Sequence, residues 1–290
     1  MIFLRLLARL PFPVLYGISD ILYVVLAYIV RYRQDVIREN LRLSFPEKSP
    51  DTIQQIANDF YRNLADILVE TIKLSAIKPC ELKKRFLYTN PELIKEYLAA
   101  GQTVICTGSH QCNWEWVPSA AVVIDIPVDS VYKPLTNPDM EKFMQELRAT
   151  HGAVPTPMNL LPRQMVIRRG IPRVIALVAD QVPNVPEQGY WMEFLNRDTA
   201  FYPGTERLAR SKNLPVFFLE LVRIRRGYYE GTFKLIACPP YTNIPEGAIL
   251  EMYRDQLQAN ICKHPSDWLW SHKRWKHWRG KYANIEAKLT

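Results

Sequence analysis

The sequence predicts an α/β fold in which a mixed β-sheet is flanked by helices and follows an N-terminal membrane-anchoring helix. Short apolar runs rich in β-branched residues alternate with segments of helical periodicity, the pattern of strands separated by helices in a layered fold. The 290 residues are 48% hydrophobic, which is ample for a packed core and excludes a disordered chain. We expect an anchor with its basic flank over residues 1–38 and one large domain over residues 39–290.

The N-terminal segment from Pro13 to Val30 is apolar except for Ser19 and Asp20. Crossing a bilayer takes about 20 apolar residues, so the segment is borderline for a full span. A membrane-embedded anchor, an interfacial helix and a core helix are the alternatives, and the near absence of a polar stripe favours the embedded anchor. The arginines after the segment predict that the following chain lies on the cytoplasmic side. They are Arg31, Arg33 and Arg38.

The chain is basic and carries an odd number of cysteines. Lys and Arg number 37 against 29 Asp and Glu, a net charge of +8, which suggests nucleic acid, an anionic membrane or a phosphorylated substrate as partner. The cysteines show no CxxC spacing, so we expect buried, reduced thiols in a cytosolic compartment. They are Cys80, Cys106, Cys112, Cys238 and Cys262.

The first half of the large domain is predicted to be helical. Ser49 can cap a helix whose first turn holds Pro50 and Asp51. A second helix runs from Pro91 to Ala99 and ends before Gly101. The apolar residues of the first helix recur at steps of three and four, which places them on one face: Ile53, Ile56, Phe60, Leu64, Ile67 and Leu68.

Strands and helices are predicted to alternate after Gly101. The expected strands are Thr103–Gly108, Asp129–Tyr132, Arg173–Asp180, LPVFFLELVRI and YYEGTFKLIAC, the last two joined by a turn at Gly227. The expected helices are Trp114–Val123 with a bend at Pro118, PDMEKFMQELRATHG, GTERLARSKN and Ala248–Lys263.

The decapeptide TGSHQCNWEW places His110 directly after a predicted strand and Glu115 five residues later. Residues five apart on a helix are rotated by about 140° and do not share a face. We therefore expect His110 in the turn after the strand, Asn113 as the cap of a helix beginning at Trp114, and Glu115 folding back towards the imidazole. An imidazole steadied by a carboxylate can act as a general base on a substrate hydroxyl. This edge of an α/β sheet is also where ligands bind.

Other interpretations of this spacing stay open. A histidine after a strand is often a structural residue held by hydrogen bonds. A metal site built on His110, Cys112 and Glu115 lacks a second cluster of ligands, so no metal is expected.

Five segments, in order, resemble the late lipid A acyltransferases, which belong to the lysophospholipid-acyltransferase-like superfamily and transfer lauroyl and myristoyl chains in Gram-negative bacteria. They are TGSHQCNWEW, VYKP, ALVADQ, AFYPGTERLARSKNLPVFF and PSDWLWSHKRW. The earlier segment VIRENLRLSFPE is similar to that family as well, so the resemblance covers nearly the whole chain. It implies an enzyme of the bacterial inner membrane whose acyltransferase catalytic domain, residues 39–290, lies on the cytoplasmic face.

The resemblance implies roles for individual residues. His110 matches the catalytic histidine of the family and Glu115 matches its acidic partner. Lys133 stands where the family usually has arginine, which keeps the charge but loses the bidentate geometry and puts phosphate or pantetheine recognition in doubt. The other substrate-binding candidates are Asp180 and Gln181 at a strand end, and Gly204 and Thr205 at a helix start whose N–H groups can bind an oxyanion.

The resemblance also implies a mechanism and partners. His110 would take the proton of an acceptor hydroxyl on a glycolipid precursor, and the oxygen would attack the thioester of acyl carrier protein or acyl-CoA. No cofactor and no covalent acyl-enzyme are expected. The alternatives are an acyltransferase for another membrane lipid, such as a glycerophospholipid or an aminolipid, and a non-enzymatic basic protein that binds membranes.

The C-terminal segment DWLWSHKRWKHWRGK interleaves tryptophans with basic residues. Such a segment can stack on single-stranded nucleic acid, lie at a membrane interface, or pack in the core with a solvated basic face. Nucleic acid is not expected as a partner, and the other two interpretations are compatible with each other. The resemblance favours a structural role near the site for Trp268, Trp270, His272 and Arg274.

Overall fold

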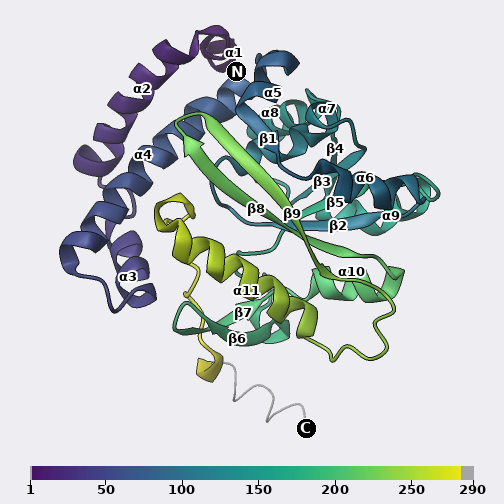
Figure 1. Cartoon of the computed structure of the whole chain (residues 1–290). Helices are drawn as coiled ribbons and strands as arrows, with labels where there is room; N and C mark the ends of the chain where they lie inside the picture. The colour runs from purple at the N-terminus through teal and green to yellow at the C-terminus, as the bar shows by residue number, and fades with distance from the viewer. Residues whose placement is uncertain (1, 282–290) are drawn as a thin grey trace.

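A computed structural model describes residues 2–281 and confirms the α/β class (Figure 1). Seven strands form one mixed sheet in the order β1-β9-β8-β2-β5-β3-β4. Neighbouring strands run parallel, except that β8 and β9 form an antiparallel hairpin. The strands of this sheet are β1 (Phe86–Tyr88), β2 (Val104–Gly108), β3 (Val128–Tyr132), β4 (Val154–Pro157), β5 (Val174–Val178), β8 (Val216–Arg225) and β9 (Tyr228–Ala237). A separate antiparallel pair is formed by β6 (Tyr190–Phe194) and β7 (Arg197–Phe201).

Helices flank the sheet and connect its strands, and the first four lie together at one side of the molecule (Figure 1). These are α1 (Ile2–Arg9), α2 (Phe12–Val24), α3 (Gln34–Ser44) and α4 (Pro50–Leu74), and α2 continues as a π-helical segment, Val25–Ile29. The others are α5 (Pro79–Arg85), α6 (Pro91–Ala99), α7 (Ala120–Val123), α8 (Pro138–Ala149), α9 (Leu161–Ile167), α10 (Gly204–Lys212) and α11 (Ala248–Lys263).

Most predicted elements are confirmed. The hydroxyl of Ser49 caps α4 by accepting a hydrogen bond from the backbone N–H of Thr52 at 3.2 Å. Helices α6, α8, α10 and α11 occupy the predicted segments. The predicted helix after Trp114 is a 3₁₀ helix, Trp114–Ser119, before α7 begins. Pro118 lies inside the 3₁₀ turn, where its missing N–H disfavours a regular α-helix.

The sequence patterns do not reveal β1, β4 or the β6–β7 hairpin. Strand β1 has three residues, and β4 contains Pro155 and Pro157, which a sheet accepts at its edge. The β6–β7 turn places Leu195 at φ 49° and Asn196 at φ 63°, a turn that usually requires glycine or asparagine. Leucine gives no turn signal, so this hairpin escapes a sequence-based prediction.

The parallel strands β2, β5 and β3 end at the same edge of the sheet. Gly108, the last residue of β2, pairs with Val178, the last residue of β5. The chain therefore delivers His110, Asp180 and Lys133 to one edge, since each follows the end of one of these strands.

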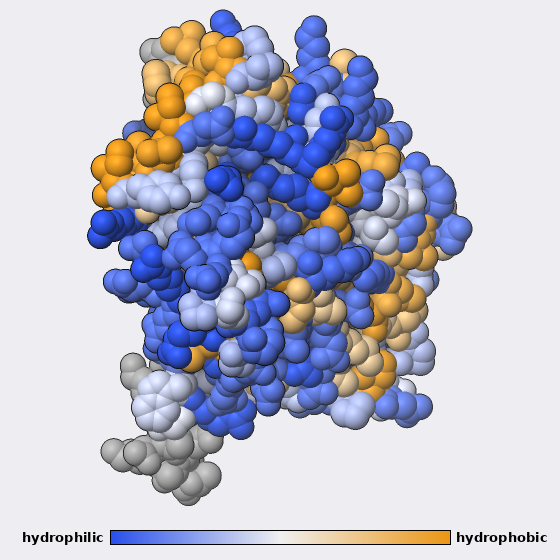
Figure 2. Space-filling view, turned by 60° about the vertical axis from the view of Figure 1, so that its left-hand side comes forward, coloured by the Kyte–Doolittle hydropathy of each residue, from blue (hydrophilic) through white to orange (hydrophobic). Residues whose placement is uncertain are grey.

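The apolar helix α2 packs against α4 on one face and is exposed on the other (Figure 1). The stretch Phe12–Ile29 is long and apolar enough to cross a membrane, and 17% of it is buried, which argues against the core-helix alternative. Figure 2 shows hydrophobic residues gathered over this part of the surface. Large exposed apolar side chains here are Phe3, Leu6, Val14, Ile21, Val24, Tyr28, Ile29 and Val30.

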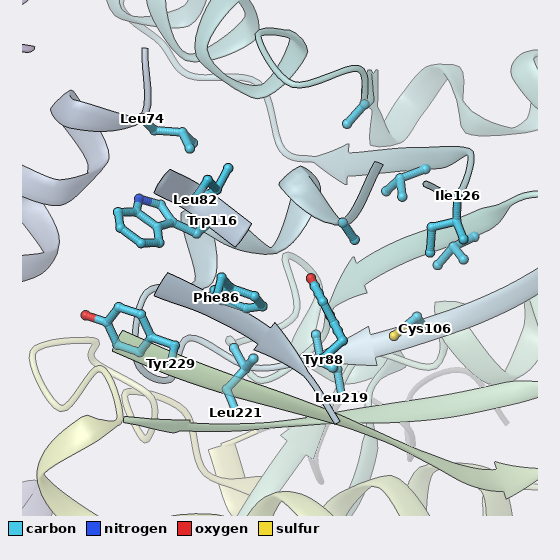
Figure 3. Close-up of a cluster of buried hydrophobic side chains, with 14 of the residues drawn as sticks. Leu74, Leu82, Phe86, Tyr88, Cys106, Trp116, Ile126, Leu219, Leu221 and Tyr229 are labelled. Carbon is cyan, nitrogen blue, oxygen red and sulfur yellow. The ribbon is translucent and has the colours of Figure 1, made fainter. Parts of the chain in front are cut away.

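A hydrophobic core lies between the sheet and the helices α4–α7 (Figure 3). Trp116 is fully buried and packs edge-on against Tyr229, with 5.8 Å between the ring centroids. Phe86 and Leu82 lie beside them in the same cluster. Burying each large side chain of this kind stabilises the fold by about 1.5–3 kcal/mol. This packing holds the 3₁₀ helix that follows the His110 turn.

The cysteine prediction is right in part. All five thiols are free, and Cys106 and Cys112 are buried. Cys80, Cys238 and Cys262 are exposed, contrary to the prediction. Cys80 lies in the first turn of α5, Cys238 follows the end of β9, and Cys262 lies on the outer face of α11.

Candidate active site

His110 lies in the turn that follows β2, as predicted, and C-terminal residues hold this turn in place. The carbonyl of His110 accepts a hydrogen bond from the N–H of Leu269 at 3.0 Å, and the N–H of Cys112 donates to the carbonyl of Asp267 at 2.9 Å. Gln111 pairs with Trp268 in a short antiparallel bridge. Cys112 has a φ of 50°, a conformation that costs free energy for a residue with a side chain. The turn is thus a defined structure and not a loose loop.

Asp180 binds His110 twice. The ring Nδ1 of His110 lies 2.6 Å from Asp180 Oδ1, and the backbone N–H of His110 donates to Asp180 Oδ2 at 2.9 Å. The indole N–H of Trp268 also donates to Oδ2, at 2.7 Å. Burial alone would raise the pKa of Asp180, but the His110 ring, the His110 N–H and Trp268 outweigh it and hold this pKa at about 2. Asp180 is therefore an ionised acceptor at neutral pH.

The ionised Asp180 determines the tautomer of His110. Because the carboxylate can only accept, Nδ1 carries the proton and Nε2 of the neutral ring keeps its lone pair. The Nε2 atom lies 3.2 Å from the amide Nε2 of Gln181, which donates to it. The His110 side chain is 19% exposed, and the edge of its ring meets Trp114 at 5.2 Å between centroids. The lone pair that a general base needs thus lies on Nε2, the ring nitrogen that Asp180 does not occupy.

Glu115 does not contact His110, so the predicted contact between them is wrong. The Glu115 carboxylate accepts hydrogen bonds from Arg148 on α8 at 3.0 Å and 3.2 Å, and from the indole of Trp114 at 3.3 Å. Glu115 lies in the first turn of the 3₁₀ helix, where its carboxylate pairs with Arg148 of α8, while Asp180, which follows the neighbouring strand β5, already occupies Nδ1 of His110. A carboxylate does bind the imidazole, but it is that of Asp180, just beyond the end of β5.

Asn113 does not cap the helix after it, contrary to the prediction. Its amide N–H group donates instead to Oε2 of the buried Glu70 on α4, at 2.8 Å. A cap needs the side-chain oxygen to accept from the first turn, and the Asn113 oxygen has no partner among residues 2–281.

Three other predicted residues lie apart from the imidazole. Lys133 is exposed after β3 and donates to Asn184 at 2.7 Å. Gly204 and Thr205 form the first turn of α10, where Thr205 is buried. Within the described part of the chain, no hydrogen bond joins Lys133, Gly204 or Thr205 to His110. The structure therefore brings together His110, Asp180 and Gln181 from the predicted set.

The C-terminal segment supplies supporting residues whose contacts the sequence did not reveal. Trp268 and Trp270 are buried, with their rings edge-on at 4.7 Å between centroids, whereas Trp278 is 61% exposed. Burial lowers the pKa of His272 to about 4, which keeps its ring neutral. Arg274 is buried and donates to the carbonyl of Ala200 at 2.7 Å. The motif PSDWLWSHKRW indicated a structural role for these residues near the site, but it did not reveal the contact between Trp268 and Asp180.

The residues that the structure describes contain no group of three or more His, Cys, Asp or Glu side chains placed to hold a metal ion. The His110 imidazole and the Asp180 carboxylate are suited to proton transfer. A neutral imidazole with a buried carboxylate on Nδ1 can accept a proton at Nε2 and share the resulting charge with that carboxylate. A hydroxyl group that replaces the Gln181 amide at Nε2 would meet this base.

Comparisons with known proteins identify the family. The model of a family described as bacterial lipid A biosynthesis acyltransferase matches residues 1–277. The lipid A biosynthesis palmitoleoyltransferase of Escherichia coli (strain K12) is 23% identical over 282 residues, which cover 94% of this chain and 88% of that protein. The lipid A biosynthesis acyltransferase of Shigella flexneri shows the same identity and coverage. Since the family model spans almost the whole chain, this protein belongs to the bacterial lipid A biosynthesis acyltransferases and is an acyltransferase.

Proposed function

We propose that this acyltransferase moves a fatty acyl chain from acyl carrier protein, or another acyl thioester, to a hydroxyl group of a lipid A-type glycolipid precursor. The proposal rests on one observation above all: the partly exposed His110 side chain carries a buried, ionised carboxylate on Nδ1, which leaves the lone pair on Nε2. Family membership argues against the non-enzymatic alternative. An acceptor of another lipid class remains the second candidate, and the experiment below separates the two.

The proposed reaction is a direct transfer. Nε2 of His110 takes the proton of the acceptor hydroxyl, and the oxygen attacks the thioester carbonyl. The C–S bond then breaks, and the thiolate leaves with the proton returned from His110. Asp180 keeps the imidazole in the required tautomer and stabilises the imidazolium during the transfer. Gln181 has to give up its contact with Nε2 when the acceptor binds. Neither a cofactor nor an acyl-enzyme is needed.

The ion pair of Glu115 with Arg148 is proposed to shape the substrate side of the site. Both side chains are 14% exposed, and the guanidinium of Arg148 lies over the ring of Tyr132 at 4.9 Å. Tyr132 precedes Lys133, so two cations lie near the end of β3. Phosphate groups occur on lipid A-type acceptors and on the pantetheine arm of acyl carrier protein, and cations at this edge can bind them. The N–H groups at Gly204 are kept as a candidate oxyanion site.

The helix α2 is proposed to lie in the membrane surface and not across the bilayer. Its inner face is bonded to α4, since Ser19 donates to the buried Asp66 at 2.7 Å and Tyr16 donates to Glu70 at 3.0 Å. If α2 crossed the bilayer without α4, Asp66 and Glu70 would lose these hydrogen-bond donors. If α4 moved with it, Asp59 and other charged residues of α4 would enter the hydrocarbon core. An interfacial helix buries its apolar face and keeps these bonds.

The inner membrane and its cytoplasmic face are the proposed location, with arginines beyond α2 near anionic headgroups. The division into an anchoring part over residues 1–38 and a catalytic part over residues 39–290 belongs to the same proposal. Helix α3 runs through that boundary, so the two parts share a helix.

The test uses the full-length protein in phospholipid vesicles. Labelled acyl-acyl carrier protein is supplied with an extracted glycolipid precursor of lipid A, and parallel reactions use acyl-CoA or a lysophospholipid. The proposal expects acylated glycolipid, detected by mass spectrometry, that does not form with His110→Ala. Acylation of the lysophospholipid alone would establish the second candidate instead.

A further inference from the structure

A fully buried carboxylate on α4 connects the membrane-facing helix to the active-site turn. Glu70 is 0% exposed and accepts three side-chain hydrogen bonds. Tyr16 of α2 donates to Oε1 at 3.0 Å, while Tyr229 of β9 and Asn113 donate to Oε2 at 2.7 Å and 2.8 Å. The backbone carbonyl of Glu70 also accepts from the indole of Trp116, at 3.1 Å. One residue thus bonds to three separate parts of the fold.

Two of these partners lie in the segment that carries His110. Asn113 stands between His110 and Glu115, and Trp116 follows directly after Glu115. Figure 3 shows Trp116 and Tyr229 side by side in the core next to this segment. The strained residue Cys112, at φ 50°, lies immediately before Asn113. Asn113 is therefore separated from His110 by only two residues, and the backbone of both is held by contacts with Asp267 and Trp268.

The turn between β8 and β9 leaves space for Tyr16 of α2 to reach Glu70. The turn between β8 and β9 contains Gly227 at φ 73°, and a side chain there would overlap the hydroxyl of Tyr16. Arg226 of the same turn donates to the carbonyl of Tyr16 at 3.3 Å and to Asp20 at 2.6 Å. The position of Tyr16 is thus set on both sides, by the turn and by Glu70.

Stability alone is a weak reason to keep a carboxylate at this place. Burial raises the pKa of Glu70, which means that the ionised form is costly here, and Arg223 only partly offsets this. A well-packed apolar residue at such a site is often at least as stabilising as a buried charge. The geometry of three donors, converging from α2, β9 and the active-site turn, gives the carboxylate a different use.

We infer that Glu70 is a positioning residue for acyl transfer: it holds the His110–Glu115 turn through Asn113 and ties this turn, through Tyr16, to the helix that meets the membrane. The inference rests on the proposed function. Glu70 contacts no reacting group, so it acts on the rate only through the placement of His110. Displacement of α2 from the protein removes one of its three donors and loosens the turn, which makes full activity dependent on the docked helix.

Asp66 provides a matched control on the same helix. It lies one turn before Glu70, is 3% exposed, and also bonds to α2, through Ser19 at 2.7 Å. Its other partners are Arg223 at 3.2 Å and Arg226 at 2.7 Å and 2.9 Å, and none of its described hydrogen bonds reaches the segment from His110 to Trp116. Asp66→Asn therefore perturbs the same interface between α4 and α2 but leaves the Tyr16–Glu70 and Asn113–Glu70 hydrogen bonds in place.

The experiment compares Glu70→Gln, Asn113→Ala and Asp66→Asn in the full-length protein, reconstituted in phospholipid vesicles. Acyl transfer from acyl-acyl carrier protein to the glycolipid gives kcat and KM, and thermal unfolding gives Tm. We expect Glu70→Gln to lower kcat by about 10- to 100-fold with little change in KM, the scale of a misplaced catalytic group. Asn113→Ala should show the same kcat loss, and the double variant should be no slower. Asp66→Asn should keep kcat within about threefold at a comparable loss of Tm.

Several outcomes would overturn the inference. If Glu70→Gln and Asp66→Asn lost the same kcat at the same Tm, the loss of activity would come from lower stability of the fold and not from the placement of His110. Additive losses for Glu70→Gln and Asn113→Ala would mean that Glu70 does not act through Asn113. If Glu70→Gln does not fold, a wild-type kcat for Asn113→Ala decides against the inference. Normal transfer by these variants together with an inactive His110→Ala would leave the proposed function intact, whereas a wild-type protein without transfer would remove both.

Discussion

Asp180 accepts a 2.6 Å hydrogen bond from the His110 ring and a 2.9 Å hydrogen bond from the His110 backbone N–H. The two contacts fix both the rotation of the imidazole and the position of its main chain. They are possible because β2 and β5 are parallel neighbours that end side by side, with Gly108 opposite Val178. The carboxylate that serves the imidazole is thus supplied by the next strand of the sheet, and not by the helix that follows His110.

Replacement of Asp180 by Asn is expected to lower kcat by about 10²- to 10⁴-fold. The amide can donate to Nδ1, which shifts the ring proton to Nε2 and removes the lone pair that takes the substrate proton. Steady-state acyl transfer by the purified variant measures the effect, and thermal unfolding controls for loss of the Trp268 contact. A folded Asp180→Asn protein with wild-type kcat would show that the tautomer does not matter.

The ion pair of Glu115 with Arg148 predicts a coupled effect on substrate binding. Glu115→Gln and Arg148→Gln each remove one charge of the pair and with it the two-point hydrogen bonding between these partly buried side chains. We expect each single variant to raise KM or lower kcat/KM. The kcat/KM of the double variant should lie only slightly below that of the more impaired single variant. Fully additive losses in kcat/KM would indicate that the two side chains act independently.

The pH dependence of stability should contain a step due to His272. Burial lowers its pKa to about 4 in the folded protein, below the ordinary value near 6.5, so the unfolded chain binds the extra proton between these values. Stability is therefore full above about pH 6.5 and falls as the pH drops towards 4, by about 2 kcal/mol for this one group after allowance for its partial exposure. Urea unfolding at several pH values measures it. His272→Gln should reduce the pH slope, and an unchanged slope would refute this origin.

The exposed apolar face of α2 predicts binding to lipid vesicles. Ile29 is 70% exposed at the end of this face, and an aspartate there would place a charge in the membrane. Ile29→Asp is expected to lower the fraction bound to anionic vesicles in a flotation assay. Ile167→Asp is the matched control, because Ile167 is 62% exposed but lies on α9, away from α2. Equal losses for both variants would mean that α2 is not the membrane-binding face.

Much of the fold follows from local patterns in the sequence. The Ser49 cap, the apolar stripe of α4 and the β-branched runs of β2 and β5 each specify an element on their own. The elements that escaped prediction depend on tertiary context. Strand β4 is stable at the sheet edge despite its prolines, and the 3₁₀ helix at Trp114 forms against a core that includes Tyr229, which lies more than a hundred residues further along the chain.

The active site shows the same limit. Sequence spacing identified His110, and the family resemblance added Asp180 and Gln181, which the structure brings together. The spacing and the resemblance both predicted Glu115 as the partner of the imidazole, whereas the Glu115 carboxylate pairs with Arg148. The true contact of the imidazole joins residues 70 positions apart, and only the pairing of β2 with β5 reveals it.

The most direct test of the account is the rate of acyl transfer by His110→Ala. Purified wild-type protein and this variant are given the same acyl-acyl carrier protein and glycolipid acceptor, and the acylated product is measured over time. We expect kcat to fall by about 10²- to 10⁴-fold, the usual range for loss of a general base. A folded variant that transfers the acyl chain at a near-normal rate would contradict it.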